Sequence, residues 1–319
     1  MDRYDVVVVG GGAAGLSGAV AVARSRRSVL VVDAGEPRNA PASGVHDLLG
    51  QEGRAPAELL SAGRDELRGY GGTVRQGTAV AARRDGEGFA VELGDGSTVR
   101  ARRLLVATGL VDELPDVPGV AELWGTDVLH CPYCHGWEAR DAAIGVLATS
   151  PLVMHGALLW RQLSDDVTVF LHTADALTDD DLERLAARDI AVVTGAVSAL
   201  ETADGRLTGV RLADGTVVPR RYVVVAPRFT ARSAVLAGLG LEPEELRMGD
   251  TVIGTAVPTG PDGATAVPGL YVAGNVADLR GQVMVSAAQG LMAGARINAE
   301  LVEQDAAVAV RRRAERVPA

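Results

Sequence analysis

Residues 6–33 read VVVVGGGAAGLSGAVAVARSRRSVLVVD, and the order of apolar runs and glycines in this stretch decides the fold. The first four residues are an unbroken β-branched run, which is typical of a strand buried on both faces of a sheet. Gly10, Gly12 and Gly15 follow in GxGxxG spacing, ahead of a small-residue helix and a second apolar run that ends in Asp33. The stretch therefore predicts a strand, a glycine turn, a helix and a second strand.

Each position in this order has a physical role in binding a dinucleotide. Gly10 allows the tight turn, Gly12 lets the backbone approach a pyrophosphate, and Gly15 lets the helix pack on the strand. The helix N-terminus favours the anion. Ala14 lies in the same turn, and Asp33 is placed to bind ribose hydroxyls. We predict a dinucleotide site here, and the alternative is a glycine-rich turn without a ligand.

The composition limits the possible partners. The chain has 319 residues, 47% hydrophobic and 23% charged, which suggests about two domains. Its formal net charge is -10 and it contains no lysine. A nucleic-acid partner is not expected, because neutralising phosphates requires a basic face. The only basic cluster, residues 311–316, is predicted to be a solvated helix end or tail.

Residues 6–23 carry no charge and could be taken for a membrane span or a secretory signal. Two features argue against both. The preceding MDRYD is acidic rather than basic, and five of the residues in this segment are glycine, which would break an apolar helix. We therefore expect a cytoplasmic protein without a membrane segment.

The chain also repeats itself. Residues 89–109 read FAVELGDGSTVRARRLLVATG, and residues 207–227 read LTGVRLADGTVVPRRYVVVAP. Each copy predicts a strand, a DG turn, another strand, an arginine pair and an apolar strand. Two copies of one nucleotide-binding fold follow, giving an α/β protein with two doubly wound units. The second copy should begin with strands at residues 142–148 and 166–171.

The second copy lacks the residues that grip a phosphate. Residues 148–151 read ATSP where the glycines should stand. Side chains at these positions crowd a pyrophosphate, and Pro151 has no N–H to offer. The second strand is followed by His172 and Thr173, with no arginine to hold a 2′-phosphate. We predict a nucleotide-binding architecture without its phosphate site.

Residues 130–138 read HCPYCHGWE and contain both cysteines of the chain. CxxCH is the spelling of a c-type haem attachment site, and the flanking histidines could also suggest zinc. Without export, haem attachment and a structural disulfide are out of place, and four ligands so close in sequence do not easily surround one metal. Two cysteines that close so small a ring are typical of electron exchange. We predict a redox dithiol and no metal site.

Together these features resemble the low-molecular-weight thioredoxin reductase family of flavoproteins over nearly the whole chain. The motifs that carry the resemblance are GxGxxG, ATG at residues 107–109, CxxC, and GLYVAGNVADLRGQVMV at residues 269–285. CPYCHGWE is most similar to dithiol oxidases that close disulfides in natural products of the gliotoxin and holomycin type, a form of antibiotic biosynthesis. The resemblance implies FAD as cofactor, a homodimer, and two dinucleotide-binding domains.

The resemblance also implies roles around the cysteines. Cys134 would lie against the flavin, and Cys131 would exchange disulfide with the substrate. His135 stands where the reductases carry an aspartate, and an imidazole suits proton transfer near neutral pH; the alternative is a histidine that caps the following turn. We expect His130 to be structural. Tyr133 and Trp137 either line an apolar substrate site or pack in the core.

The remaining implied contacts are with the cofactor. The usual GD of the family is Gly274-Asn275 here, so a neutral amide that can still accept a hydrogen bond replaces a carboxylate. A helix over residues 283–301 would aim its positive end at the flavin. Including the first motif, the expected cofactor-binding residues are Gly10, Gly12, Ala14, Gly15, Asp33, Thr108, Gly109, Asn275, Gln282 and Val283.

The expected function is that of an FAD-dependent dithiol oxidase acting on a small-molecule dithiol. A substrate thiolate would attack the Cys131–Cys134 disulfide, Cys134 would pass electrons to FAD, and dioxygen would reoxidise the flavin. His135 would take the thiol proton. The alternatives are a disulfide reductase fed by NADPH or another donor, and a redox-sensing flavoprotein.

The two domains are expected to be interleaved. The FAD-binding domain would comprise residues 1–115 and 241–319, and the second domain residues 116–240. Residues 115–119, which read PDVPG, are the expected hinge.

Overall fold

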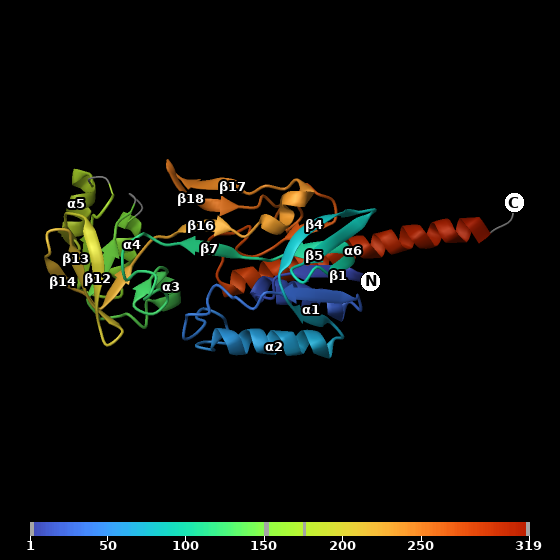
Figure 1. Ribbon diagram of the computed structural model, residues 1–319, viewed down its shortest axis with the longest axis horizontal. Coiled ribbons are helices and arrows are strands. Elements are labelled where there is room, and N and C mark those ends of the chain that lie inside the picture. Colours follow the sequence, from blue (N-terminus) through green and yellow to red (C-terminus); the bar gives the residue numbers. More distant parts are fainter. Residues whose placement is uncertain (1–2, 150–152, 175–176, 317–319) are drawn as a thin grey trace.

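The computed structural model describes residues 3–149, 153–174 and 177–316. It has two lobes, and helix α6 (Val283–Arg316) extends beyond the first lobe toward the C-terminus (Figure 1). The first lobe contains β1 (Arg3–Val9), α1 (Ala13–Arg24), β2 (Val29–Asp33), α2 (Pro56–Gly69), β3 (Thr73–Gln76), β4 (Ala79–Asp85), β5 (Gly88–Leu93), β6 (Thr98–Val106), η1 (Ala234–Leu239), β19 (Leu270–Val272) and α6.

The second lobe and the sheet beside it hold the remaining elements. The second lobe contains β8 (Val128–Leu129), α3 (Pro132–His135), β9 (Ile144–Leu147), α4 (Val153–Trp160), β10 (Val167–Phe170), α5 (Asp179–Ala186), β11 (Ala191–Val193), β12 (Val197–Ala203), β13 (Arg206–Leu212), β14 (Val217–Pro219) and β15 (Tyr222–Val224). A four-stranded sheet, in the order β17-β18-β16-β7, contains β7 (Leu110–Glu113), β16 (Arg228–Ala231), β17 (Glu244–Met248) and β18 (Thr251–Ala256).

The first lobe is built on a seven-stranded sheet in the order β3-β2-β1-β6-β5-β4, with β19 also pairing with β6. Strand β1 lies between β2 and β6 and is parallel to both. The valines at residues 6–9 are at most 4% exposed, because the sheet is covered on both faces. The predicted strand, turn, helix and strand are therefore confirmed.

Helices α1 and α6 pack backbone to backbone through glycines. A Cβ at Gly290 would lie 1.9 Å from the carbonyl oxygen of Ala14. One at Gly294 would lie 2.5 Å from the carbonyl oxygen of Gly18. Only residues without a side chain allow this approach, so α6 is held closely against the helix that follows the glycine turn.

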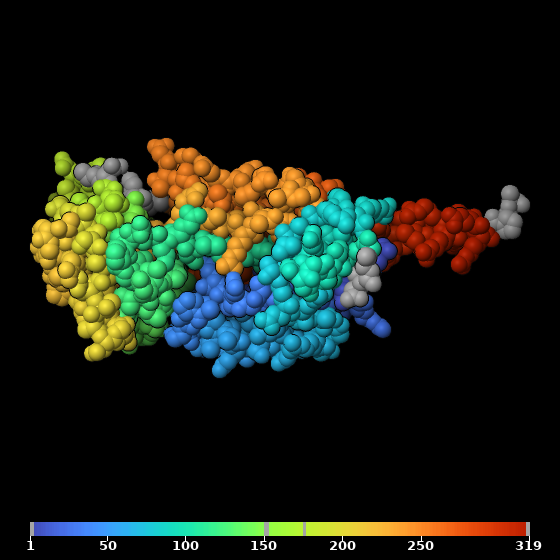
Figure 2. Space-filling model, viewed as in Figure 1, coloured from blue at the N-terminus to red at the C-terminus, as the bar shows by residue number. Residues whose placement is uncertain are grey.

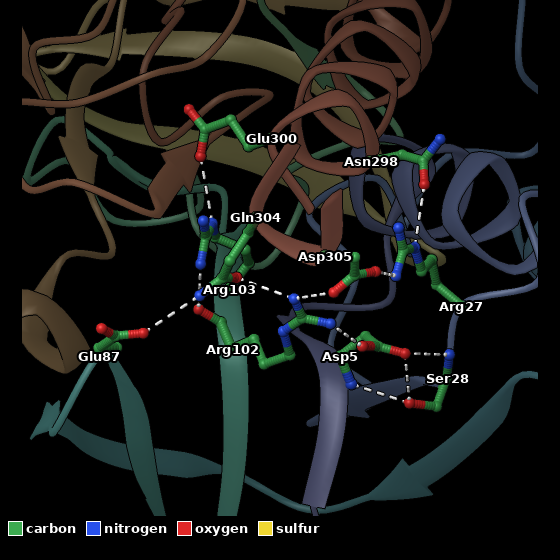
Figure 3. Close-up of polar contacts among 10 residues, drawn as sticks. All are labelled: Asp5, Arg27, Ser28, Glu87, Arg102, Arg103, Asn298, Glu300, Gln304 and Asp305. Carbon is green, nitrogen blue, oxygen red and sulfur yellow. Dashed lines mark hydrogen bonds and ion pairs between the residues drawn. The ribbon is translucent and has the colours of Figure 1, made fainter. Parts of the chain in front are cut away.

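A polar network ties a later part of the same helix to the first lobe (Figure 3). Asp305 of α6 lies between Arg27 and Arg102 and accepts a hydrogen bond of 2.5 Å from each. Arg102 also donates to Asp5 at 2.9 Å. The start of β1, the strand β6 and the turn after α1 are thereby tied to α6.

The second lobe repeats this plan, which confirms the two copies inferred from sequence. Its five-stranded parallel sheet runs β11-β10-β9-β15-β8, and β9 lies between β10 and β15 as β1 lies between β2 and β6. A β12-β13-β14 sheet corresponds to the strands β4, β5 and β6. The predicted strands at residues 142–148 and 166–171 are β9 and β10.

One detail of the repeat was predicted wrongly. Residues 98–106 form the single strand β6, whereas the sequence pattern placed two strands there. In the second copy the strand does divide, into β14 and β15. Pro219 stands in the second copy where the first has Ala101, and proline has no N–H to continue the ladder.

The chain crosses between the lobes twice, at β7 and at β16. These two strands pair with each other, antiparallel, from Leu110 opposite Ala231 to Glu113 opposite Arg228. Residues after the second crossing, including Leu236, pack in the core of the first lobe. We therefore propose domain boundaries near residues 114 and 227; the predicted second boundary at residue 240 lies further along the chain.

The apolar segment at residues 6–23 is a buried strand and most of α1, rather than a continuous helix. Within the part of the chain that the structure describes, no helix is both long and apolar enough to cross a membrane. Residues 311–316 are the exposed last turns of α6. The helix predicted to end at residue 301 is thus longer than expected.

Candidate active site

The glycine turn and the two cysteines open onto one cavity of about 2180 Å³. This is larger than the roughly 300–1,000 Å³ of an ordinary small-ligand pocket, so it has room for a dinucleotide and a second ligand. Of the thirteen predicted site residues, all but Gly15 line it. The cavity also reaches the end of β9 and the start of α4 in the second lobe.

The glycines have the geometry that their predicted roles require. Gly10 has φ +103°, and a Cβ there would lie 2.3 Å from the carbonyl oxygen of Ala107. A Cβ at Gly15 would lie 1.9 Å from the carbonyl oxygen of Gly10, so the helix packs on the turn. A Cβ at Gly12 would meet nothing within 4 Å, which leaves this backbone open to the cavity.

Polar groups surround this turn. The carboxylate of Asp33 accepts a hydrogen bond of 3.1 Å from the N–H of Gly11. Thr108 donates through Oγ1 to the carbonyl oxygen of Arg232 at 2.6 Å, and Gly109 takes φ +74° directly after it. These contacts join the end of β2 to the glycine turn, and the segment after β6 to the segment after β16.

The predicted C-terminal contacts lie at the start of α6. Asn275 donates from Nδ2 to the carbonyl oxygens of Asp278 and Gly281, both at 2.8 Å. Its Oδ1 accepts from Arg38 at 3.2 Å. Gln282 and Val283 line the cavity where α6 begins, so the helix aims its N-terminal end into it.

The CxxC pair occupies a short helix, α3, with Cys131 at its N-cap. Both cysteines are free thiols, and Cys134 donates to Cys131 over an Sγ–Sγ distance of 2.7 Å. That hydrogen bond, followed by the backbone N–H groups of Cys134 and Tyr133, lowers the pKa of the Cys131 thiol to about 7. Sharing its proton in this way raises the pKa of Cys134. In the reduced pair this hydrogen bond thus favours the thiolate of Cys131.

The cysteines differ in their neighbours as well. The side chain of Gln282 hydrogen-bonds Cys131 and helps to lower its pKa. Arg38 acts on Cys134, favouring its thiolate against the larger effect of Cys131. The assignment of Cys134 as the flavin-facing thiol stays a prediction.

The two histidines beside the cysteines have different surroundings. His130 Nδ1 lies 3.0 Å from the carbonyl oxygen of Val225, and its ring meets that of Phe229 edge-on at 5.3 Å. These contacts fit a structural role. His135 ends α3 and lines the cavity. Burial lowers the pKa of His135, so its imidazole is neutral and able to accept a proton near pH 7.

The neighbouring aromatic side chains are not core residues. Tyr133 is 63% exposed and lines the cavity. Trp137 is 68% exposed and lies against the guanidinium of Arg140, 4.2 Å from the ring centroid. Core packing is therefore wrong for both, and only Tyr133 remains a candidate wall for a ligand.

Arg38 is a site residue that sequence reasoning missed. It donates two hydrogen bonds to Asp112 of β7, at 2.7 and 2.6 Å, and lies over the ring of Phe229 of β16. With its contact to Asn275, it joins the cofactor side of the cavity to both crossing strands. No local sequence motif identifies Arg38, because its partners lie far away along the chain.

Comparisons with known proteins agree with this geometry. A profile of the pyridine nucleotide-disulphide oxidoreductase family matches residues 4–290. The chain belongs to that family. It is 33% identical to thioredoxin reductase tcpT of Claviceps purpurea over 75% of this chain and 78% of the relative. It is 30% identical to thioredoxin reductase sirT of Leptosphaeria maculans over 95% and 96% of the two chains.

Solved structures give the same result. The crystal structure of HlmI superposes with a TM-score of 0.91 at 46% identity, covering 98% of this chain and 97% of that one. An oxidoreductase from Agrobacterium tumefaciens superposes with a TM-score of 0.87 at 34% identity, covering 94% and 99%. The protein is thus a thioredoxin reductase-like flavoprotein with two dinucleotide-binding domains, acting on thiols and disulfides.

The cofactor of this oxidoreductase is FAD, and the residues present fit it. The open backbone at Gly12 would face the pyrophosphate and Asp33 a ribose, as their positions in the motif require. We propose Thr108, Asn275 and Gln282 as further contacts. Bound there, FAD would supply a two-electron acceptor beside the thiol pair.

The loop after β9 corresponds to the second phosphate loop expected from the sequence. Thr149 lines the cavity after the buried Ala148, whereas Ser150 and Pro151 lie outside the described residues. His172 takes φ +46° after β10 and accepts a hydrogen bond from the N–H of Val197 at 3.0 Å. Its imidazole nitrogen is therefore used within the fold. Among residues 3–149, 153–174 and 177–316, no cluster of three metal-ligating side chains occurs.

Proposed function

We propose that this flavoprotein is a dithiol oxidase that forms a disulfide in a small natural-product dithiol, with dioxygen as the final acceptor. The observation that carries the proposal is the CxxC pair, which lies in the cavity that begins at the Gly10 turn. The direction of the reaction is supported by the second domain, whose sequence at residues 148–151 lacks glycines for NADPH.

The thiol chemistry can be written as two exchanges. In the oxidised enzyme, a substrate thiolate attacks Sγ of Cys131, the bond to Cys134 breaks, and Cys134 leaves as a thiolate. The second substrate sulfur then attacks the first, releasing the product disulfide and Cys131. Once Cys134 has taken up a proton, its hydrogen bond lowers the pKa of Cys131 to about 7, which makes Cys131 a good leaving group in this second step.

The balance closes with one molecule of dioxygen. The dithiol would lose two electrons and two protons through the cysteine pair, and dioxygen would take up both to become hydrogen peroxide. Bound FAD would supply the electron carrier between the cysteine pair and dioxygen. His135 is the proposed base for the substrate thiol, because it is neutral and lies beside the pair on α3. Tyr133 would form part of the substrate wall.

The test uses purified holoprotein under strict anaerobiosis. We expect excess NADPH to leave the flavin absorbance unchanged, dithiothreitol to bleach it, and air to restore it with release of peroxide. Cys131→Ser is the control, expected to retain FAD but not to bleach with the dithiol. Rapid bleaching by NADPH would support a reductase instead. Failure of the dithiol to bleach the wild-type flavin would overturn the proposal.

We also propose that the protein is a cytoplasmic homodimer. Supporting the dimer, one stretch of α6 exposes four large apolar side chains, Met284, Val285, Leu291 and Met292. Leu291→Arg is expected to shift the mass in sedimentation equilibrium from two chains to one. Leu49→Arg, which changes an exposed leucine elsewhere, should leave the mass unchanged. A wild-type protein of one chain would contradict the dimer.

A further inference from the structure

The loop between β2 and α2, residues 34–55, reaches from the cofactor side of the cavity to the CxxC segment. Its end is closed by a backbone bridge between Val45 and Arg54. His46 lies next to this bridge and lines the cavity. In Figure 2 the blue spheres of this loop lie against the green spheres of the segment that follows β8. The loop is therefore in position to influence the thiol chemistry.

His46 lies between two carboxylates. Its Nδ1 is 2.5 Å from Glu52 of the same loop, and its Nε2 is 3.5 Å from Glu138 of the other lobe. The N–H of Asp47 holds Glu52 in place at 3.2 Å. The hydrogen bond with Glu52, and then the charges of Glu138, Glu52 and Asp47, raise the pKa of His46 against the effect of burial. His46 is thus the group of the cluster whose protonated, positively charged form is favoured.

Glu138 also lies on the same helical turn as the proposed base. It follows His135 by three residues, in a turn that continues α3 through a hydrogen bond of 3.3 Å from the N–H of Ala139 to the carbonyl oxygen of His135. Residues three apart in a helical turn lie on the same side. Burial lowers the pKa of His135, the charge of Glu138 raises it, and His46 and His130, when protonated, lower it.

We propose that His46 and Glu138 form a charge pair that sets the charge state of His135, which makes both of them positioning residues for the thiol chemistry. The inference rests on the proposed function of His135 as a base. A base must be neutral before it accepts a proton and must be stabilised once it carries one. Glu138 stabilises the imidazolium, while His46 competes for the same carboxylate and keeps the resting imidazole neutral.

The charge pair makes opposite predictions for its two members. His46→Gln removes a positive charge, so the pKa of His135 should rise; Glu138→Gln removes a negative charge, so it should fall. Each shift should be about half a pH unit or more, as expected for one charge near a partly buried group. Glu52→Gln should also raise the pKa of His135. Without the Glu52 carboxylate the pKa of His46 falls, so His46 carries less positive charge. Side chains that merely held the loop in place would not give shifts of opposite sign.

The measurement is an NMR titration of the histidine rings in holoprotein labelled with 13C-histidine. The chain has five histidines, and each signal is assigned by its loss in the corresponding His→Gln variant. His155→Gln is the matched control, since His155 is exposed on α4 and is not among the charged groups that act on His135, and it should leave the pKa of His135 unchanged. Flavin absorbance shows that each variant retains FAD and its fold.

The result expected is a rise with His46→Gln and a fall with Glu138→Gln. Shifts in one direction, or no shift in either variant, would overturn the charge pair. The titration needs no turnover, so it is independent of the proposed activity. The pH dependence of the rate of flavin bleaching by dithiothreitol then tests the base itself. The pH at which this rate falls on the acidic side should move with the pKa of His135 measured by NMR. If that pH stays fixed while the pKa of His135 moves, the base role is refuted, although the charge pair is still supported.

Discussion

Replacing Gly290 by alanine is expected to destabilise the FAD-binding lobe by about 2 kcal/mol, the difference between two opposing effects. Alanine favours a helix interior over glycine by about 1 kcal/mol. Against this, the added Cβ would lie 1.9 Å from the carbonyl oxygen of Ala14. Backbone cannot rotate away as a side chain can, so the cost should lie near the upper end of the roughly 1–3 kcal/mol of an overpacked core. Helices α1 and α6 would have to separate.

The assay is urea unfolding of the holoprotein, followed by flavin fluorescence and far-ultraviolet circular dichroism. Gly156→Ala in α4 is the control, because a Cβ there would meet nothing within 4 Å. It should stabilise by up to about 1 kcal/mol. Moving α6 should also displace Gln282 and Val283, so Gly290→Ala should bind FAD more weakly, measured by titrating the apoprotein. A Gly290→Ala protein as stable as wild type, with FAD bound as tightly, would refute the close packing of the two helices.

Three further changes test the site. Cys134→Ala removes the hydrogen bond that stabilises the Cys131 thiolate, so the pKa of Cys131 should rise from about 7 toward that of an ordinary thiol; a pH titration of thiolate absorbance that still gives about 7 would contradict this. Gly10→Ala should yield colourless protein, because its Cβ would collide with backbone at 2.3 Å; a normal flavin-to-protein absorbance ratio would disprove it. Asp112→Asn should cost about 2 kcal/mol by weakening the charged hydrogen bonds from Arg38, and urea midpoints unchanged from wild type would count against it.

The parts of the fold that sequence reasoning predicted are those that neighbouring residues determine. The strand, turn and helix at residues 6–24 follow from a β-branched run and three glycines, which allow few other structures. The repeat made the second lobe predictable as well. The C-terminal end of α6 was not predictable from the sequence, because the apolar residues after residue 301 no longer follow the spacing of a buried helix face. Alanine and arginine, both strong helix formers, continue the helix into solvent there.

The residues of the site also fall into those that a local sequence pattern identifies and those that it does not. Its glycines and cysteines stand in recognisable spacings, so they could be named before the structure. Arg38 could not, since its partners Asp112 and Asn275 lie 74 and 237 residues away. His46 likewise meets Glu138 only because the loop folds across to the other lobe. Such pairs carry no local pattern, and only the fold brings them together.

The pairing of β7 with β16 has a mechanical consequence. Two separate linkers would let the lobes swing in any direction, but these two strands pair with each other, and β16 pairs with β18 as well, so their hydrogen bonds resist bending in the plane of the sheet. Twisting about the long axis breaks none of them, since β ribbons tolerate a wide range of twist. The joint between the lobes should therefore behave as a torsion spring. Arg38 hydrogen-bonds Asp112 on one strand and lies over the ring of Phe229 on the other. A rotation of the joint would therefore displace Arg38 on the cofactor side of the cavity.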